Sequence, residues 1–333
     1  MRIETRPADY YTLPDLTGET QSLHRQSIAT PNGSGTPTAL PDHSPGWYSA
    51  GVWRMGRRSA GWLPRSAALA TARAAGWVWW LFAPQRRRAV VANLLPVTGS
   101  LPKTRTCARR MFQEFACKLV DLWQFENGRS PADLFGELQG WEHLQAAQQQ
   151  GRGQLLVSPH LGNWELGGPL LASRGVTLTV ITRPEPEGLT RMRERARARW
   201  GIQTVVVGDG AFGFVEVIRH LEKGACVALL VDRPAPDSAV PVQLFGRPFL
   251  ASIAPAELAR ASGCAIIPVT IVRTSAGYRG VAGAPVPYER AALRQPAARQ
   301  QLLQNIMDAV APVIAAHPEQ WFHFAPIWPE EKA

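Results

Sequence analysis

The chain has 333 residues, of which 45% are hydrophobic, so it can bury a full core and global disorder is excluded. Lys and Arg outnumber Asp and Glu by 36 to 26, which gives a formal net charge of +10. The scattered cysteines show neither metal-ligand spacing nor a disulfide-framework pattern, which is typical of a chain in a reducing compartment.

Residues 1–46 are rich in Thr, Pro, Ser and Gly and have little periodic hydrophobicity. We expect a disordered or loosely attached extension. Residues 1–11 contain no apolar run, so no secretory signal is predicted.

Residues 47–140 are predicted to be helical, with helices at 65–82, 84–95 and 103–125. Asp and Glu are absent from residues 44–113, where arginines alternate with tryptophans. This combination is typical of the membrane interface. The apolar run 74–83 is shorter than the roughly 20 residues of a spanning helix. We therefore expect an interfacial or shallowly inserted helix; a tilted spanning helix and a buried helix of a soluble subdomain are the alternatives.

Residues 141–333 alternate between predicted strands and helices. This alternation indicates an α/β core with a mostly parallel central sheet flanked by helices. The strands are expected at 154–157, 177–181, 204–207, 226–231 and 265–272, and the helices at 164–173, 190–200, 212–222, 255–262 and 298–316.

The segment His160-Leu161-Gly162-Asn163-Trp164-Glu165 follows the first of these strands. It places a histidine at the carboxyl end of a strand, where parallel α/β sheets bind ligands. Glu165, in the first turn of the next helix, is expected to orient the His160 imidazole, which then takes a proton from a hydroxyl. The plainer alternative is a structural histidine, with Asn163 as an ordinary N-cap and Glu165 favoured there by the helix dipole.

Further charged residues follow other predicted strands: Arg183 follows the second, and Asp232 and Arg233 follow the fourth. A parallel sheet brings such strand ends to one edge, so we expect these side chains to converge near His160. Arginine suits bidentate binding of phosphate or carboxylate.

A competing pattern is the G-x-G-x-x-G at 208–213, which lies between a predicted strand and helix. Asp232 ends the next strand, as an acidic ribose ligand does in a dinucleotide-binding fold. The alternative function is therefore an NAD(P)-dependent oxidoreductase, although the glycines also suit a simple loop-to-helix turn. A non-catalytic binder of membrane or nucleic acid is a third alternative, driven by the basic front of the chain.

Taken together, these motifs resemble the lipid A biosynthesis (lauroyl/myristoyl) acyltransferase family, within the lysophospholipid acyltransferase-like superfamily. The resemblance runs from about Trp47 to Trp328. His160 and Glu165 fit the family's H-x4-D/E box. The other matching segments are Arg183-Pro184, Asp232-Arg233, Phe245-Gly246-Arg247-Pro248 and Pro318-Glu319-Gln320-Trp321.

The resemblance implies a membrane-associated acyltransferase in which His160 and Glu165 are catalytic. The residues expected to bind substrate are Arg183, Asp232, Arg233, Asn163, Phe245 and Gly246. No metal or cofactor is expected.

The implied donor is an acyl thioester on acyl carrier protein or CoA, and the acceptor is a hydroxyl of an anionic membrane lipid such as a lipid A precursor. The implied location is the cytoplasmic face of the bacterial inner membrane, with no nucleic acid as partner. The tail 322–328 and the extension 1–46 depart from the family pattern, so a phosphatidylinositol mannoside or another membrane glycolipid or amino lipid stays open as acceptor.

Overall fold

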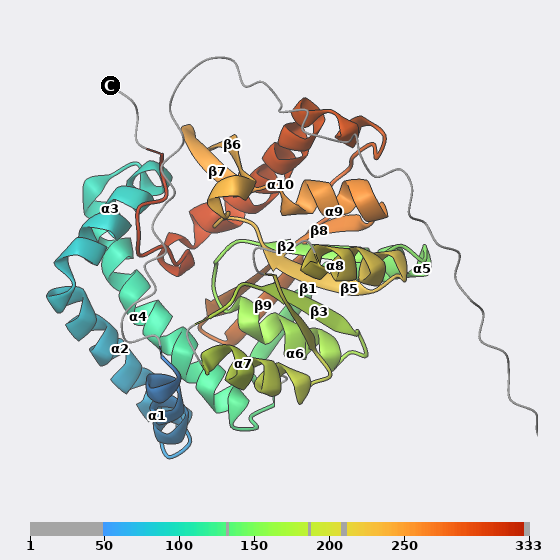
Figure 1. Ribbon diagram of the computed structural model, residues 1–333. Helices are drawn as coiled ribbons and strands as arrows, with labels where there is room; N and C mark the ends of the chain where they lie inside the picture. The colour runs from blue at the N-terminus through green and yellow to red at the C-terminus, as the bar shows by residue number, and fades with distance from the viewer. Residues whose placement is uncertain (1–48, 131–132, 186–187, 208–211, 330–333) are drawn as a thin grey trace, which may run out of the picture. The chain divides into compact units, whose positions relative to one another are not determined.

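The computed structural model describes residues 49–130, 133–185, 188–207 and 212–329. The extension expected at 1–46 lies outside these residues. The described chain begins with the helices α1 (Ala50–Ala60), α2 (Arg65–Phe82), α3 (Pro84–Thr98) and α4 (Leu101–Glu126), which lie together beside the sheet (Figure 1). The helices expected at 65–82, 84–95 and 103–125 are confirmed.

The helix α2 packs against α4 through a stripe of small residues. Ala68, Ala72 and Gly76 recur at the spacing of one helix face and are buried. A Cβ on Gly76 would lie 2.6 Å from the backbone of Phe112 and Gln113, so the two helix backbones approach closely there. The opposite face of α2 consequently leaves large apolar side chains exposed. No helix in the described part of the chain has both the length and the hydropathy to cross a bilayer.

The strands form a mostly parallel sheet in the order β1-β9-β8-β2-β5-β3-β4, in which β8 and β9 are antiparallel. The strands predicted from the sequence correspond to β2 (Gln154–Ser158), β3 (Leu178–Thr182), β4 (Gln203–Val206), β5 (Cys226–Leu230) and β8 (Ala265–Thr274). Two strands of this sheet were not predicted, β9 (Gly277–Ala282) and β1 (Phe135–Gln139), and neither were the two strands of the separate hairpin at 239–252. The strand β1 lies within the region expected to be helical and pairs in parallel with β9.

The central strand β2 is buried along its whole length and separates two apolar cores. Leu155 and Val157 belong to the core shared with α3, α4, α8 (Phe212–Glu222), α9 (Ala254–Ser262) and α10 (Pro296–Ala316). Leu156, on the other face, packs with residues of α5 (Trp141–Gln149) and α6 (Gly167–Ala172). The alternation of side chains along a strand therefore gives helices on both faces of the sheet. The expected α/β class is confirmed.

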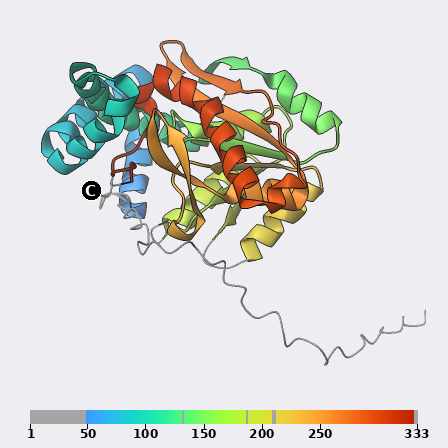
Figure 2. The ribbon, with the colours of Figure 1, turned by 90° about the horizontal axis from the view of Figure 1, so that it is seen from above.

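A hairpin outside this sheet joins β6 (Ala239–Leu244) to β7 (Arg247–Ser252) and lies beside α10 (Figure 2). Its two-residue turn is Phe245-Gly246, and both residues have positive φ, 50° and 73°. This is the geometry that matches the twist of the flanking strands. The helix α7 (Leu189–Ala198) runs between β3 and β4.

The loop after β2 is fixed by backbone contacts at Gly162. Its φ is +61°, and a Cβ there would lie 1.8 Å from the carbonyl oxygen of Ile271 in β8. Its N–H donates to the carbonyl of Gln320 (2.9 Å). The loop is thus held between β8 and the C-terminal segment, and only glycine fits at this position.

Gly162→Ala is expected to lower the free energy of unfolding by about 3 kcal/mol or more, because it adds a backbone clash to an unfavourable φ. The control is Gly99→Ala, since Gly99 has φ +67° and nothing within 4 Å of an added Cβ. The control is expected to cost about 1–2 kcal/mol. Urea unfolding midpoints measure both, and equal losses would contradict the tight fit at Gly162.

Candidate active site

The register of β2 and β5 places His160 beside Asp232. These neighbouring parallel strands pair Ser158 with Leu230, and the N–H of Val231 continues the ladder to the Ser158 carbonyl (3.0 Å). His160 and Asp232 each lie two residues beyond that last pair. They therefore meet at the carboxyl edge of the sheet, where parallel α/β sheets bind ligands.

Within the described residues, the Asp232 carboxylate accepts hydrogen bonds from four N–H groups. His160 donates through its backbone N–H to Oδ2 (2.9 Å) and through Nδ1 to Oδ1 (2.6 Å). Trp321 Nε1 and His323 Nε2 each donate to Oδ2 at 2.9 Å. Burial raises the pKa of Asp232, but the two histidines and their hydrogen bonds outweigh burial and hold it well below its usual value.

The partners of Asp232 fix the protonation of both histidines. Asp232 is ionised and only accepts, so His160 carries its proton on Nδ1 and His323 carries one on Nε2. His323 Nδ1 in turn accepts from Arg233 Nε (3.4 Å). Burial, then the Arg233 charge, lowers the pKa of His160 to about 3, and burial also lowers that of His323. The imidazole of His160 is therefore neutral, and its Nε2 lone pair is available to accept a proton.

The C-terminal segment closes over this pair. Phe322 N–H donates to the His160 carbonyl (2.9 Å), and Leu161 forms a β-bridge with Trp321. Trp321 is fully buried, and Phe245 at the hairpin turn lies against it, with ring centroids 6.2 Å apart. The site is thus assembled from segments more than 160 residues apart in sequence, since His160 and Phe322 are bonded directly.

Glu165 does not pair with His160, and this corrects the expected geometry. Its carboxylate forms ion pairs with Arg193 and with Arg197 (3.2 Å), both on α7. Burial raises the pKa of Glu165, but these arginines dominate and lower it. The chain turns at Gly162, so that Trp164 lies 5.0 Å from the His160 ring while the next residue is directed towards α7. Asp232 takes the place at His160 that the sequence assigned to Glu165.

Of the other residues expected at the site, Arg233 lies beside His323, whereas the rest have different surroundings. Arg183 is exposed and donates to the carbonyl of Arg233 (3.1 Å), and Arg233 also bonds the Phe322 carbonyl. Asn163 is fully buried, and its Nδ2 donates to the Lys118 carbonyl and to Tyr278 Oη, both at 3.3 Å. Asn163 therefore attaches the loop to α4 and β9 and is surrounded by protein. Gly246 lies at the exposed tip of the hairpin.

Two residues of this site were not predicted. His323 was noted only as part of an atypical tail, and its contact with Asp232 depends on the fold of the C-terminal segment. Lys118 lies on α4, and its residue type alone does not separate it from the other basic residues of that region. The helical periodicity of α4 places Lys118 on the buried face of the helix, and this position could have identified it as unusual.

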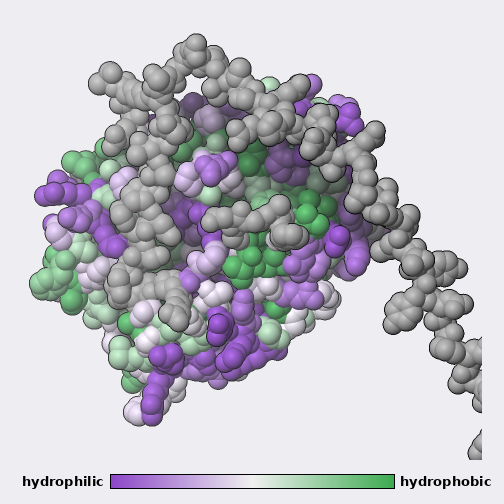
Figure 3. Space-filling model, viewed as in Figure 1, coloured by the Kyte–Doolittle hydropathy of each residue, from purple (hydrophilic) through white to green (hydrophobic). Residues whose placement is uncertain are grey.

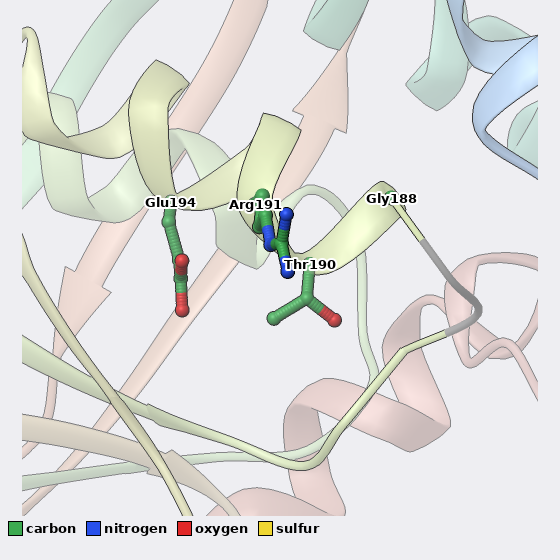
Figure 4. A pocket seen from close by; sticks show the side chains of 4 residues that line it. All are labelled: Gly188, Thr190, Arg191 and Glu194. Carbon is green, nitrogen blue, oxygen red and sulfur yellow. The ribbon is translucent and has the colours of Figure 1, made fainter.

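The described residues contain hollows on either side of α7 that do not include the His160 pair. One, of about 440 Å³, is lined by residues at the start of α7: Gly188, Thr190, Arg191 and Glu194 (Figure 4). The other, of about 240 Å³, is lined by Phe125, Glu126, Gly128, Ala196, Arg199 and Trp200. Neither is lined by a histidine, so we assign the chemistry to His160 and not to these hollows.

The glycine-rich pattern at 208–213 falls mostly on residues 208–211, outside the described part of the chain. Asp232, which a dinucleotide would require for its ribose, is buried and saturated by N–H donors. The geometry therefore gives no support to the oxidoreductase alternative.

Comparison with known proteins decides between the remaining functions. A model of the bacterial lipid A biosynthesis acyltransferase family matches residues 43–330. The chain belongs to this family. Phosphatidylinositol mannoside acyltransferases are among its relatives: that of Mycobacterium tuberculosis (strain ATCC 25618 / H37Rv) is 28% identical over 250 residues, or 74% of this chain and 77% of its own. That of Mycolicibacterium smegmatis is 30% identical over 189 residues, 56% of this chain and 60% of its own. The protein is therefore an acyltransferase.

Asp232→Asn is expected to lower kcat by about 10³-fold or more, because an amide cannot accept at both positions and favours the wrong His160 tautomer. Glu165→Gln is expected to lower kcat less than about tenfold and to lower stability by about 2 kcal/mol, since it weakens the pairs to α7. Acyl-transfer kinetics and thermal unfolding separate the two effects. Equal losses of kcat would show that Glu165 serves His160 as Asp232 does.

Proposed function

We propose that this acyltransferase moves a fatty acyl group from a thioester to a hydroxyl of a phosphate-bearing glycolipid, with His160 as general base. The observation that carries the proposal is the neutral His160 imidazole, tied to Asp232 through Nδ1 at the carboxyl edge of the sheet. The side chain of His160 keeps 14% of its surface exposed, so a substrate can reach it.

In this mechanism His160 Nε2 takes the proton of the acceptor hydroxyl as its oxygen attacks the thioester carbonyl. The tetrahedral intermediate then collapses, the carbon–sulfur bond breaks, and the imidazolium returns the proton to the departing thiolate. The products are an ester and a free thiol. Asp232 stabilises the cation that His160 becomes during the transfer. Such a base contributes on the order of 10²–10⁴-fold to the rate.

The choice of acceptor rests on the relatives. The family is named for lipid A biosynthesis, and the related mycobacterial proteins are named for phosphatidylinositol mannoside. Both acceptors are glycolipids that carry phosphate. We accordingly take a phosphoglycolipid as the acceptor of this chain and an acyl-CoA or acyl carrier protein thioester as its donor, at the cytoplasmic face of a bacterial inner membrane.

A patch on α1 and α2, with the loop between them, suits a membrane surface. Phe82 and Trp62 are about four-fifths exposed (81% and 79%). Further exposed apolar residues accompany them: Met55, Leu63, Trp77, Val78 and Leu81. Exposed arginines occur among and beside these residues: Arg54, Arg58, Arg73 and Arg88. Hydrophobic and hydrophilic surface accordingly alternates along the edge formed by α2 and α3 (Figure 3). Apolar side chains together with arginines favour anionic lipid over nucleic acid.

His160→Ala is expected to abolish acyl transfer while the protein stays folded, because it removes the imidazole that deprotonates the acceptor. The assay is radiolabelled acyl transfer from palmitoyl-CoA to phosphatidylinositol mannoside, with circular dichroism for the fold. His143→Ala on α5 is the matched control and should keep normal turnover. A His160→Ala protein with near-normal turnover would refute the mechanism.

Trp62→Ala combined with Phe82→Ala is expected to weaken binding to anionic vesicles by roughly tenfold or more, since each aromatic ring contributes its buried apolar area. Flotation with phosphatidylglycerol vesicles measures the bound fraction. Val215→Ala on α8, where Val215 is also exposed, is the control and should bind as the wild type does. Equal binding of all three proteins would rule out this patch as the membrane contact.

A further inference from the structure

Lys118 carries a buried ammonium group beside the active site. It lies on α4 and is only 6% exposed. Its Nζ lies 3.3 Å from the centroid of the Trp164 ring and 5.8 Å from that of Phe115. Trp164 lies in the same loop as His160 and comes directly after Asn163.

Among the described residues, no oxygen or nitrogen accepts a hydrogen bond from Lys118 Nζ, and no carboxylate forms an ion pair with it. A largely buried ammonium without a protein acceptor is unfavourable, because it has given up most of its water and gained no equivalent partner. The face of the Trp164 indole compensates only in part. A methionine would fill the same space at no such cost. The ammonium is therefore best explained by a ligand that supplies the acceptor.

The charged groups around Lys118 are already committed to one another. Both carboxylate oxygens of Glu165 are paired, one with Arg193 and the other with Arg197. Glu185 also pairs with Arg193 (2.9 Å). Arg233, whose charge also acts on Lys118, is bonded to the C-terminal segment. These acids consequently have their own cations, and Lys118 adds positive charge to the site.

The position of Lys118 links it to the reacting groups. Trp164 contacts the Lys118 ammonium with its ring, and the same ring lies 5.0 Å from the imidazole of His160. An anionic group that bonds Lys118 over this indole would therefore lie in the same site as a hydroxyl at His160. The Arg233 charge acts on both Lys118 and His160 and also favours an anion in this site.

We propose that Lys118 binds a phosphate oxygen of a substrate in the active site, with the indole of Trp164 as the platform for its ammonium. This inference rests on the proposed acyl transfer, and it adds a substrate-binding residue to it. The phosphate belongs either to the acceptor glycolipid or to the thioester donor, and the kinetics below distinguish these sources.

The experiment measures KM and kcat separately for palmitoyl-CoA and for phosphatidylinositol mannoside with Lys118→Met. Loss of a hydrogen bond from a buried charge is expected to raise one of the two KM values by roughly 10- to 100-fold. A rise for phosphatidylinositol mannoside assigns the phosphate to the acceptor, and a rise for palmitoyl-CoA assigns it to the donor. Lys103→Met, an exposed lysine on the same helix α4, is the control and should leave both values unchanged. Unchanged KM values in Lys118→Met, or a fall in kcat alone, would overturn the proposal.

The pH dependence provides a second test. Burial, with Glu165 opposing it and Arg193 and Arg233 adding to it, lowers the pKa of Lys118 to about 7. The charged form that binds phosphate is therefore present below about pH 7 and is lost above it. The KM of the wild type should rise above this pH, whereas Lys118→Arg should keep a flat profile because a guanidinium stays charged. Identical profiles for the two proteins would contradict the assignment.

Stability and chemical labelling test the residue without turnover. Because it replaces a buried ammonium with an apolar side chain, Lys118→Met should unfold at the same temperature as the wild type or higher. A lower midpoint would indicate a structural role and overturn the proposal. Reductive methylation of the wild type should reach Lys118, and vesicles containing phosphatidylinositol mannoside, or palmitoyl-CoA alone, should protect it, with the exposed Lys103 and Lys223 as references. Protection by neither compound would overturn the proposal.

These outcomes separate the two proposals. Acyl transfer that survives His160→Ala would defeat the proposed function. Acyl transfer that is lost in His160→Ala but has unchanged KM values in Lys118→Met would defeat only the inference about Lys118.

Discussion

Four N–H groups converge on the buried carboxylate of Asp232, and the geometry of the site depends on this convergence. Asp232 is 2% exposed, so its charge can be kept only because these donors replace water. The same bonds set the tautomers of His160 and His323 and anchor Trp321. Removing the carboxylate would leave several buried donors without a partner at once. A single acidic residue therefore joins the end of one strand, the loop of its neighbour and the C-terminal segment.

A second cluster of charges supports the loop from the opposite side. Arg193 links Glu165 to Glu185, and its guanidinium lies 5.1 Å from the Trp53 ring of α1. Asp121 of α4 accepts from Arg65 of α2 and from Tyr278 of β9, and Tyr278 Oη accepts in turn from Asn163. Both networks join the α1–α4 helices to the loop of His160. These helices consequently contribute to the site as well as to the exposed patch.

The fold class and most elements could be predicted from the sequence, because strands such as β2 and helices such as α2 carry their periodicity locally. The strands β1 and β9 could not, since their pairing links residues far apart and their hydrophobic runs are short. The histidine was found from its place after a strand. Its carboxylate partner was assigned to the nearest acid, Glu165, whereas strand order brings Asp232 closer. Sequence spacing contains no information on which strands are neighbours. Lys118 and His323 were missed for the same reason, because the sequence does not show which distant segments contact the loop of His160.

The docking of the C-terminal segment has a consequence for the order in which the protein acquires its function. The α1–α4 helices and His160 leave the ribosome well before Trp321 and His323, two donors to Asp232 that come much later in the sequence. A nascent chain can therefore present its exposed aromatic face long before its base is oriented. The hydrogen bonds of Asp232 are complete only once Trp321 and His323 have been synthesised, so a chain that stalls short of Trp321 would contain His160 beside a carboxylate that lacks two of its donors.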